Sequence, residues 1–325
     1  MPPYIELENM PSAAVASATR PTVRPESGSG GDDANPWAVF LRDLAGVGQI
    51  RIGTSLPAVT LEHRGNWPGA RLTGVLGIAS GRRFRLWMML RHWSHIDRSR
   101  RDAAVADPLR RFRVLDVQGA PLLDLGFGEG RQEIALEALI GRHNVCRIPS
   151  WSEAASTLTG NPQSFNGNVL RRQMAELGGS PNADDIAEAT GQLRLYPARL
   201  RERGHVAAVD VELIPCFLEA LAEQALPVRI VTGTSGVAHS LDSTFFGYRR
   251  EGSWQALRGD SSLFRIDASK IDSAWVLNVS EGAREHTTLR LYDARGRSLA
   301  TLGAAPGFAA EENPIWRTLV NALRD

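Results

Sequence analysis

The sequence is almost without lysine. Lys270 is the only one among 325 residues, so nearly all of the positive charge is arginine. A skew of this kind usually reflects genome base composition, which makes a single arginine weak evidence for anion recognition. The formal net charge of +1 indicates no general attraction to nucleic acid or to a membrane surface, and we expect no nucleic-acid partner.

Cysteine and long apolar runs are scarce as well. Cys146 and Cys216 are far apart and form no C-x-x-C pair, which argues against a disulfide framework and a thiolate metal site. No apolar run is long enough to cross a bilayer, so we expect no membrane insertion. Residues 1–35 have too little apolar surface to offset the entropy of ordering and predict a disordered tail. This tail lacks a secretory-signal pattern, and the cytoplasm is the expected location.

What the sequence does contain is a repeat. Residues 112–119 (FRVLDVQG) align with residues 289–296 (LRLYDARG), and each segment reads as strand, Asp-x-x-Gly turn and strand. Residues 40–45 align with residues 217–222, each as a short amphipathic helix. An ordered match of this kind indicates duplication. We therefore predict an α+β fold of two tandem repeats, each an antiparallel β-sheet flanked by helices.

The predicted organisation has four parts. Residues 1–35 are the disordered tail, residues 36–145 the first α+β repeat, residues 146–210 a helical inter-repeat segment, and residues 211–325 the second α+β repeat. Gly- and Pro-bearing turns recur at short spacing within each repeat. They favour a meandering antiparallel sheet over βαβ crossovers.

One glycine-rich run points to a different function. Residues 123–130 (LDLGFGEG) are similar to the D-x-G-x-G-x-G loop of S-adenosylmethionine-dependent methyltransferases, in which glycines let the backbone approach the cofactor. Here the run ends a predicted hairpin strand, and its counterpart in the second repeat is residues 300–307 (ATLGAAPG). The strands that follow do not alternate with helices, so a SAM-dependent methyltransferase is the most distant of three interpretations.

The other motifs resemble one family in order. Residues 252–257 (GSWQAL) and 271–276 (IDSAWV) follow the pattern G-P-W-x-x-V … I-x-x-A-W-V at the same spacing. Residues 84–87 (FRLW) and 92–95 (HWSH) follow L-R-x-F … H-W-x-H. Together they resemble the bacterial cytoplasmic haemin-degrading and haem-carrier proteins of haem utilisation, which are tandem duplications of an α+β unit. The resemblance implies haem as ligand or substrate.

Three of the contacts that this family makes with haem are missing. The family's axial ligand is a histidine in a D-V-H-x-F segment that opens a helix between the halves, but the matching residues 162–170 contain no histidine. After the strand that carries Trp275, the family's basic R-K-P turn is replaced by residues 278–281 (NVSE). Its aromatic-Gly-x-Arg segment is replaced by residues 302–306 (LGAAP). Loss of the axial ligand would affect haem degradation before it affected binding.

The candidate haem-binding residues follow from this resemblance. Arg85 and Trp87 match residues that face haem in the family, and the period of two in a strand puts them on one face; an ordinary polar strand face is the other interpretation. His205 is the only histidine in the inter-repeat segment and is the candidate ligand of the haem iron, although an exposed turn histidine is the simpler and favoured interpretation. His92 and His239 are the next candidates.

His63 is of interest because of its position within the first repeat. We expect His63 and His239 to occupy equivalent positions in the two copies, which favours a structural role for both.

Two functions remain beside the methyltransferase. The first is haemin binding with trafficking or degradation in haem-iron utilisation, with a haem-uptake transporter or a haem-receiving protein as candidate partner. The second is a non-catalytic paralogue that keeps the fold as a regulatory or partner-binding module. The three missing contact motifs favour the second function, and the retained residues 85–87 (RLW) favour the first.

Overall fold

The computed structural model of the chain describes residues 36–73, 76–99, 111–126, 131–143, 183–191, 205–281, 284–306 and 312–324. The N-terminal helices and strands are α1 (Pro36–Asp43), β1 (Gln49–Leu56), β2 (Val59–Asn66), β3 (Arg71–Thr73), β4 (Leu76–Ser80), β5 (Phe84–Met89), β6 (His95–Ser99), β7 (Arg111–Leu115), β8 (Pro121–Gly126) and α2 (Arg131–His143). They are followed by α5 (Ala183–Ala189), β9 (His205–Val209), α7 (Ile214–Glu223), β10 (Pro227–Thr234), β11 (Val237–Thr244), β12 (Gly247–Glu251), β13 (Trp254–Arg258), β14 (Ser262–Asp267), β15 (Ser273–Glu281), β16 (Arg284–Tyr292), β17 (Ser298–Ala304) and α8 (Pro314–Asn321).

The same order of elements occurs twice. Helix α1 or α7 leads into the strands β1–β8 or β10–β17, and helix α2 or α8 follows. This order confirms the α+β fold of two tandem repeats. Within the segment expected to be helical, α5 is a helix, but His205–Val209 form strand β9, which pairs with β15. Residues 162–170, where the family's ligand histidine would lie, are outside the described residues.

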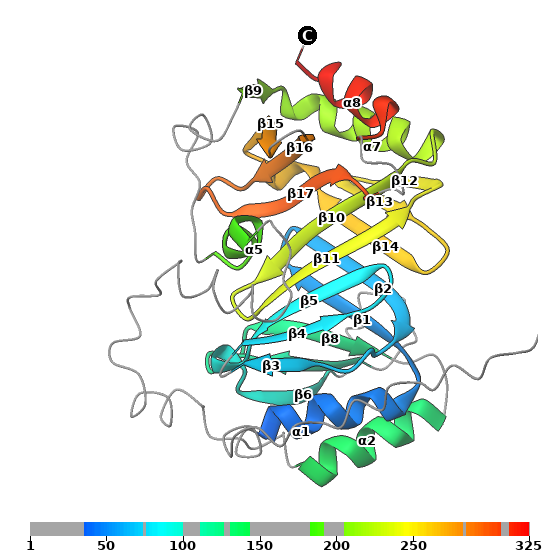
Figure 1. Cartoon of the computed structure of the whole chain (residues 1–325), viewed down its shortest axis with the longest axis vertical. Helices are drawn as coiled ribbons and strands as arrows, with labels where there is room; N and C mark the ends of the chain where they lie inside the picture. Colours follow the sequence, from blue (N-terminus) through cyan, green and yellow to red (C-terminus); the bar gives the residue numbers. More distant parts are fainter. Residues whose placement is uncertain are drawn as a thin grey trace, which may run out of the picture. The chain divides into compact units, whose positions relative to one another are not determined.

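Strands from both repeats form each of two antiparallel sheets. The strand order is β12-β13-β14-β2-β1-β8-β7-β6 in one sheet and β3-β4-β5-β11-β10-β17-β16-β15-β9 in the other. Strand β5 of the first repeat pairs with β11 of the second, and β14 of the second pairs with β2 of the first. Figure 1 shows cyan β5 beside yellow β11. The repeats therefore exchange three strands each.

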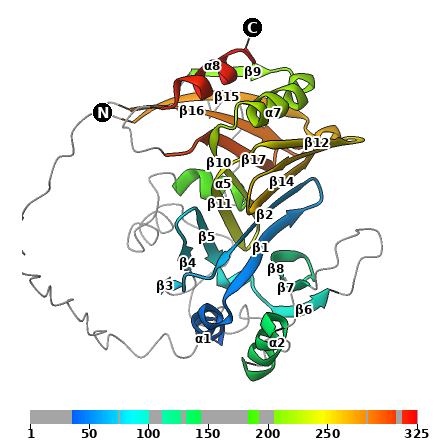
Figure 2. The same ribbon diagram turned by 90° about the vertical axis from the view of Figure 1, so that its right-hand side faces the viewer.

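This exchange gives the two repeats a common core. Ile52 of β1 and Ile230 of β10 are fully buried members of one apolar cluster that draws on both repeats. Trp93 of the first repeat donates from Nε1 to Gly236 O, in the β10–β11 turn of the second, at 3.0 Å. Helices α1 and α2 lie together at one end, and α7 and α8 lie together at the other (Figure 2). The two repeats therefore cannot unfold independently without exposing shared core surface.

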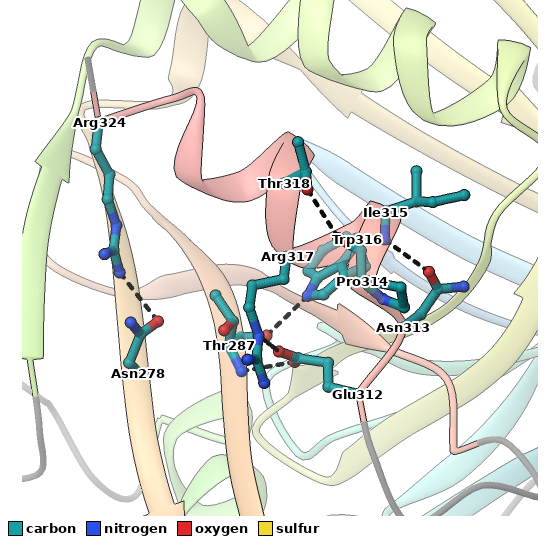
Figure 3. Close-up of polar contacts among 10 residues, drawn as sticks. All are labelled: Asn278, Thr287, Glu312, Asn313, Pro314, Ile315, Trp316, Arg317, Thr318 and Arg324. Atoms are coloured by element: carbon teal, nitrogen blue, oxygen red, sulfur yellow. Dashed lines mark hydrogen bonds and ion pairs between the residues drawn. The ribbon is translucent and has the colours of Figure 1, made fainter.

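Helix α8 is anchored at its first turn (Figure 3). Asn313 caps it by accepting from the backbone N–H of Ile315 at 2.9 Å. Trp316 is fully buried and donates from Nε1 to Thr287 O at 3.0 Å, and Glu312 accepts from Thr287 N–H at 2.7 Å. These contacts fix α8 against strand β16.

The topology decides against the methyltransferase interpretation. Residues 123–126, the first half of the glycine-rich run, lie in β8, which pairs antiparallel with β7 and β1. Every strand pairing in the described part of the chain is antiparallel, whereas a cofactor loop of that kind belongs to a parallel sheet. None of the helices in the described ranges is long and apolar enough to span a membrane.

Candidate functional site

One face of the nine-stranded sheet carries helix α5 (Figures 1 and 2). Arg85 and Trp87 alternate with the core residues of β5 and therefore share a face, as the strand period predicts. Trp87 is only 3% exposed and packs in one cluster with Ile186 and Ala189 of α5, whereas Arg85 is exposed. The two residues that the resemblance assigns to haem thus lie on the face that α5 covers in part.

Gly233 of β10 lets α5 approach the sheet this closely. A Cβ atom at position 233 would lie 2.8 Å from the carbonyl oxygen of Ala189 and 2.7 Å from that of Val237. Both distances are well inside van der Waals contact. Immediately after the helix, Gly191 adopts a φ of 70°, the left-handed conformation that commonly ends helices.

Replacing Gly233 tests this contact. Gly233→Ala is expected to force α5 away from the sheet and to destabilise the protein by about 1–3 kcal/mol, because the added methyl group meets backbone atoms. Faster hydrogen exchange at the α5 amides and a lower midpoint in urea would show this. Gly303→Ala is the matched control, since its Cβ would lie 3.5 Å from Thr288 Cγ2, an ordinary contact. Equal behaviour of the two variants would contradict the prediction.

The polar side of α5 meets a buried arginine. Arg290 of β16 donates from Nη1 to Glu188 Oε2 and from Nη2 to Asp185 Oδ1, the latter at 2.6 Å. Tyr292 OH donates to Glu188 Oε1 at 2.5 Å. The side chains of Arg290, Glu188 and Tyr292 are almost inaccessible to solvent. Helix α5 therefore packs its apolar residues over β5 and its carboxylates over β16.

Burial and the neighbouring charges shift the pKa of Arg290 in opposite directions. Burial alone lowers its pKa, but the carboxylates of Asp185 and Glu188 outweigh burial, and the pKa lies above its ordinary value. Burial and the neighbouring Glu188 both raise the pKa of Tyr292, so the phenol stays protonated. The carboxylates of Asp185 and Glu188 thus both face the guanidinium of Arg290.

Several buried polar atoms on the same face are without a partner. Trp87 Nε1, Thr288 Oγ1 and Arg290 Nε have no hydrogen-bond partner within the described part of the chain. Strand alternation and register place all three on the α5 side of the sheet, because Thr288 and Arg290 lie opposite Leu277 and Trp275. Buried donors are normally satisfied, so this face has unused capacity to bind a polar ligand.

His205 lies on the other face of the same sheet. It is exposed at the start of the edge strand β9, and its register partner is Asn278 of β15. Val206 and Leu277 form the next pair and turn toward the α5 side, where they contact Tyr292. The structure therefore does not bring the candidate iron ligand His205 together with Trp87.

His92 lies outside the strands of the sheet. It follows β5, in the 3₁₀ turn Leu90–His92, and its Nε2 accepts a hydrogen bond from Arg91 Nε at 3.1 Å. Burial and the positive charge of Arg91 lower the pKa of His92 to about 4, against a smaller opposing effect of Asp116. The ring is neutral at neutral pH, and one nitrogen is already engaged.

His239 lies between the two sheets. Its Nε2 is 3.1 Å from His63 Nδ1, and its Nδ1 is 3.2 Å from Thr54 Oγ1. His239 is fully buried and His63 is 4% exposed. Both rings are thus held in the shared core, on the side of the nine-stranded sheet away from α5. The structural role expected of this pair agrees with the geometry.

The expected equivalence of these two histidines is wrong. Val59 and Val237 both open the second strand of the first hairpin of their repeat, opposite Leu56 and Thr234. Counting from them, His239 corresponds to Leu61, and His63 corresponds to Leu241. The alignment of the two copies is therefore displaced by two residues here, a shift that keeps each side chain facing inward.

Sequence reasoning missed the residues of the buried charged group. Arg290 and Tyr292 stood within an aligned hairpin and looked like ordinary strand residues in an arginine-rich chain. A signal was present in Asp185 and Glu188, because acids three residues apart share one face of a helix. Nothing local connects that face to β16, about one hundred residues later.

One family model matches a segment that includes most of the second repeat. Residues 193–323 match the family model described as the haemin-degrading HemS.ChuX domain. No curated protein matches the chain by sequence. The family resemblance seen in the motifs is thereby confirmed for this part of the chain.

Two solved structures share the fold over most of their length. Holo-PhuS, a heme-binding protein from Pseudomonas aeruginosa, has a TM-score of 0.66 at 17% identity, covering 89% of this chain and 85% of that one. ChuS, a heme degrading enzyme from Escherichia coli O157:H7, has a TM-score of 0.63 at 16% identity, covering 88% and 84%. At these identities the likeness establishes the fold.

Proposed function

We propose, from a second repeat that matches the haemin-degrading HemS.ChuX domain, that this protein binds haemin and serves haem-iron utilisation by trafficking or degrading it. The fold shared with the heme-binding PhuS and the heme-degrading ChuS supports the proposal. The cytoplasm is the proposed location, and a haem-uptake transporter or a haem-receiving protein is the proposed partner.

The face of the nine-stranded sheet that carries α5 is the proposed binding surface. A porphyrin needs apolar walls and donors for its acid groups. Trp87 provides an apolar wall together with an unpartnered Nε1, and the exposed guanidinium of Arg85 lies two residues before it on the same face. This combination of an apolar wall and a nearby cation, made by the two residues that the resemblance assigns to haem, is the observation that supports the proposal.

A haemin titration followed by absorption tests the function. Wild-type protein is expected to give a saturable Soret shift, and Arg85→Ala and Trp87→Ala each to weaken binding by about tenfold, roughly 1.4 kcal/mol. Arg64→Ala and Trp254→Ala are matched controls, because the exposed Arg64 and the half-buried Trp254 lie on the other sheet. Their affinities should stay at the wild-type value.

The same titration examines the ligand of the iron. His205→Ala is expected to leave the Soret shift in place, because His205 lies on the face opposite Trp87. A shift that vanishes in this variant alone would make His205 the ligand. If wild-type protein gave no shift beyond that of an unrelated protein, haem binding would be excluded, and a non-catalytic paralogue with a regulatory role would be the better account.

A further inference from the structure

We propose that Arg290 and Tyr292 anchor the acid groups of the ligand, and that Asp185 and Glu188 of α5 occupy this anchor until the ligand displaces them. The inference rests on the proposed function, since haemin is a dicarboxylate, and it names the part of the site that would recognise the propionates. The helix would then act as a competitor built into the chain.

The position of Arg290 supports this role. The sequence lacks the basic turn that the resembled family carries after the strand of Trp275, and Arg290 lies directly opposite Trp275 on the neighbouring strand. Its side chain is on the α5 side, the face that also bears Arg85 and Trp87. Arg290 of β16 could thus supply the positive charge that this chain lacks after β15.

The hydrogen bonds that hold α5 are ones that a ligand carboxylate could make. The guanidinium and the phenol donate to carboxylate oxygens of Glu188 and Asp185, and a propionate offers the same acceptor. Exchanging one carboxylate for another conserves these bonds. It also spares Arg290 the penalty of an unpaired buried charge.

Asp185 and Glu188 do not use all the hydrogen-bond donors of Arg290. The two carboxylates divide one guanidinium between them, each through a single Nη atom. Arg290 Nε, a further donor of the same guanidinium, finds no partner within the described residues. A ligand whose acid group spans Nε and one Nη would use a donor that α5 leaves idle.

In the first repeat the corresponding arginine pairs with an acid of the same sheet. Arg113 of β7 corresponds to Arg290, and it pairs at 3.1 Å with Asp124, a fixed residue of the neighbouring strand. Asp124 also accepts from Ser55 at 2.7 Å. The counterpart of Asp124 in the second repeat is Thr301, which carries no charge. The acids that pair with Arg290 in the described part of the chain come from the separate helix α5 and not from a neighbouring strand.

The test compares haemin with haemin dimethyl ester, which keeps the porphyrin but has no free acid groups. Asp185→Asn with Glu188→Gln should bind haemin about tenfold more tightly than wild type, because the competitor is weakened. Adding Arg290→Gln to that pair should lower the preference for haemin over the ester by about tenfold, and the part of the preference due to Arg85 should remain. In this triple variant residues 185, 188 and 290 are all uncharged, so it avoids removing Arg290 while its two carboxylate partners keep their charge.

An ion pair on the other sheet controls for charge alone. Arg249 and Glu251 of β12 form an exposed pair at 2.8 Å, and Arg249→Gln with Glu251→Gln should leave both affinities unchanged. Circular dichroism and thermal unfolding establish that each variant folds. Haemin added to wild-type protein should also speed hydrogen exchange at the amides of Thr190 and Gly191, which α5 carbonyls protect.

The outcomes separate this inference from the proposed function. If every variant binds haemin with an unchanged preference over the ester, the anchor is wrong and haem binding stands. If haemin slows exchange in α5, the helix is not displaced and the competitor role is wrong. If no variant binds haemin better than an unrelated protein does, the proposed function fails, and the anchor fails with it.

Discussion

Lowering the pH from about 7 to about 5 is expected to destabilise this protein by about 2 kcal/mol through His63 alone. Burial lowers the pKa of His63 to about 3. Burial, together with the neighbouring His63, also holds the pKa of His239 well below its ordinary value, so this residue adds to the loss.

The direction follows from which state binds protons. In the folded chain both rings stay neutral, whereas in the unfolded chain each takes up a proton as the pH falls through about 6.5. The unfolded state therefore binds more protons in acid, and stability falls with pH. The contribution of His63 to stability is fully present above a pH of about 6.5. It declines as the pH falls below this value, until the pH reaches the folded pKa of about 3.

The geometry explains why the rings cannot simply ionise in place. In the 3.1 Å contact between His63 Nδ1 and His239 Nε2 one nitrogen donates and the other accepts, so a second proton on the accepting ring would set two N–H groups against each other. His63 also lies against Phe84, with ring centroids 3.9 Å apart, in an apolar surrounding that cannot solvate a charge. Protonation therefore favours separation of the sheets.

Urea unfolding at a series of pH values measures the effect. The double variant His63→Leu with His239→Leu should have a flatter pH profile, and leucine is the residue that the other repeat places at each position. His205→Gln is the control, because His205 is exposed, and it should keep the wild-type slope. A double variant as acid-sensitive as wild type would show that other groups govern acid unfolding.

Trp316→Ala should destabilise the chain by about 3–5 kcal/mol, the range for removing a large aromatic side chain from a core. Trp316 is fully buried, lies 5.8 Å from Phe217 between ring centroids, and donates to Thr287 O (Figure 3). Truncation would leave a cavity between α7, α8 and β16, and would also leave that carbonyl without its donor.

The neighbouring residue provides the control. Ile315 is 48% exposed on the same helix, and Ile315→Ala should change the free energy of unfolding by no more than about 0.5 kcal/mol. Chemical denaturation of both variants, monitored by far-ultraviolet circular dichroism, distinguishes the two effects. Similar losses for Trp316→Ala and Ile315→Ala would mean that α8 is not anchored through the tryptophan.

Much of the fold was visible in the sequence because its signals are local. Hairpin turns such as Asp293–Gly296 and strand alternation depend on residues a few positions apart, so the repeat and the α+β class could be predicted. The same period placed Arg85 and Trp87 on one face. Register was harder, and the equivalence of His63 and His239 was wrong by two residues because a shift of two preserves the inward pattern.

The sequence by itself thus determined the duplication, the order of strands and the face that bears Arg85 and Trp87. Only the tertiary structure decided that β5 pairs with β11 and β14 with β2, because strands with the same pattern fit either repeat equally well. It alone also brought α5 to Arg290. Asp185 and Glu188 pair with a guanidinium that is about one hundred residues later in the sequence. A contact between residues so far apart in the sequence produces no periodic pattern from which it could be predicted.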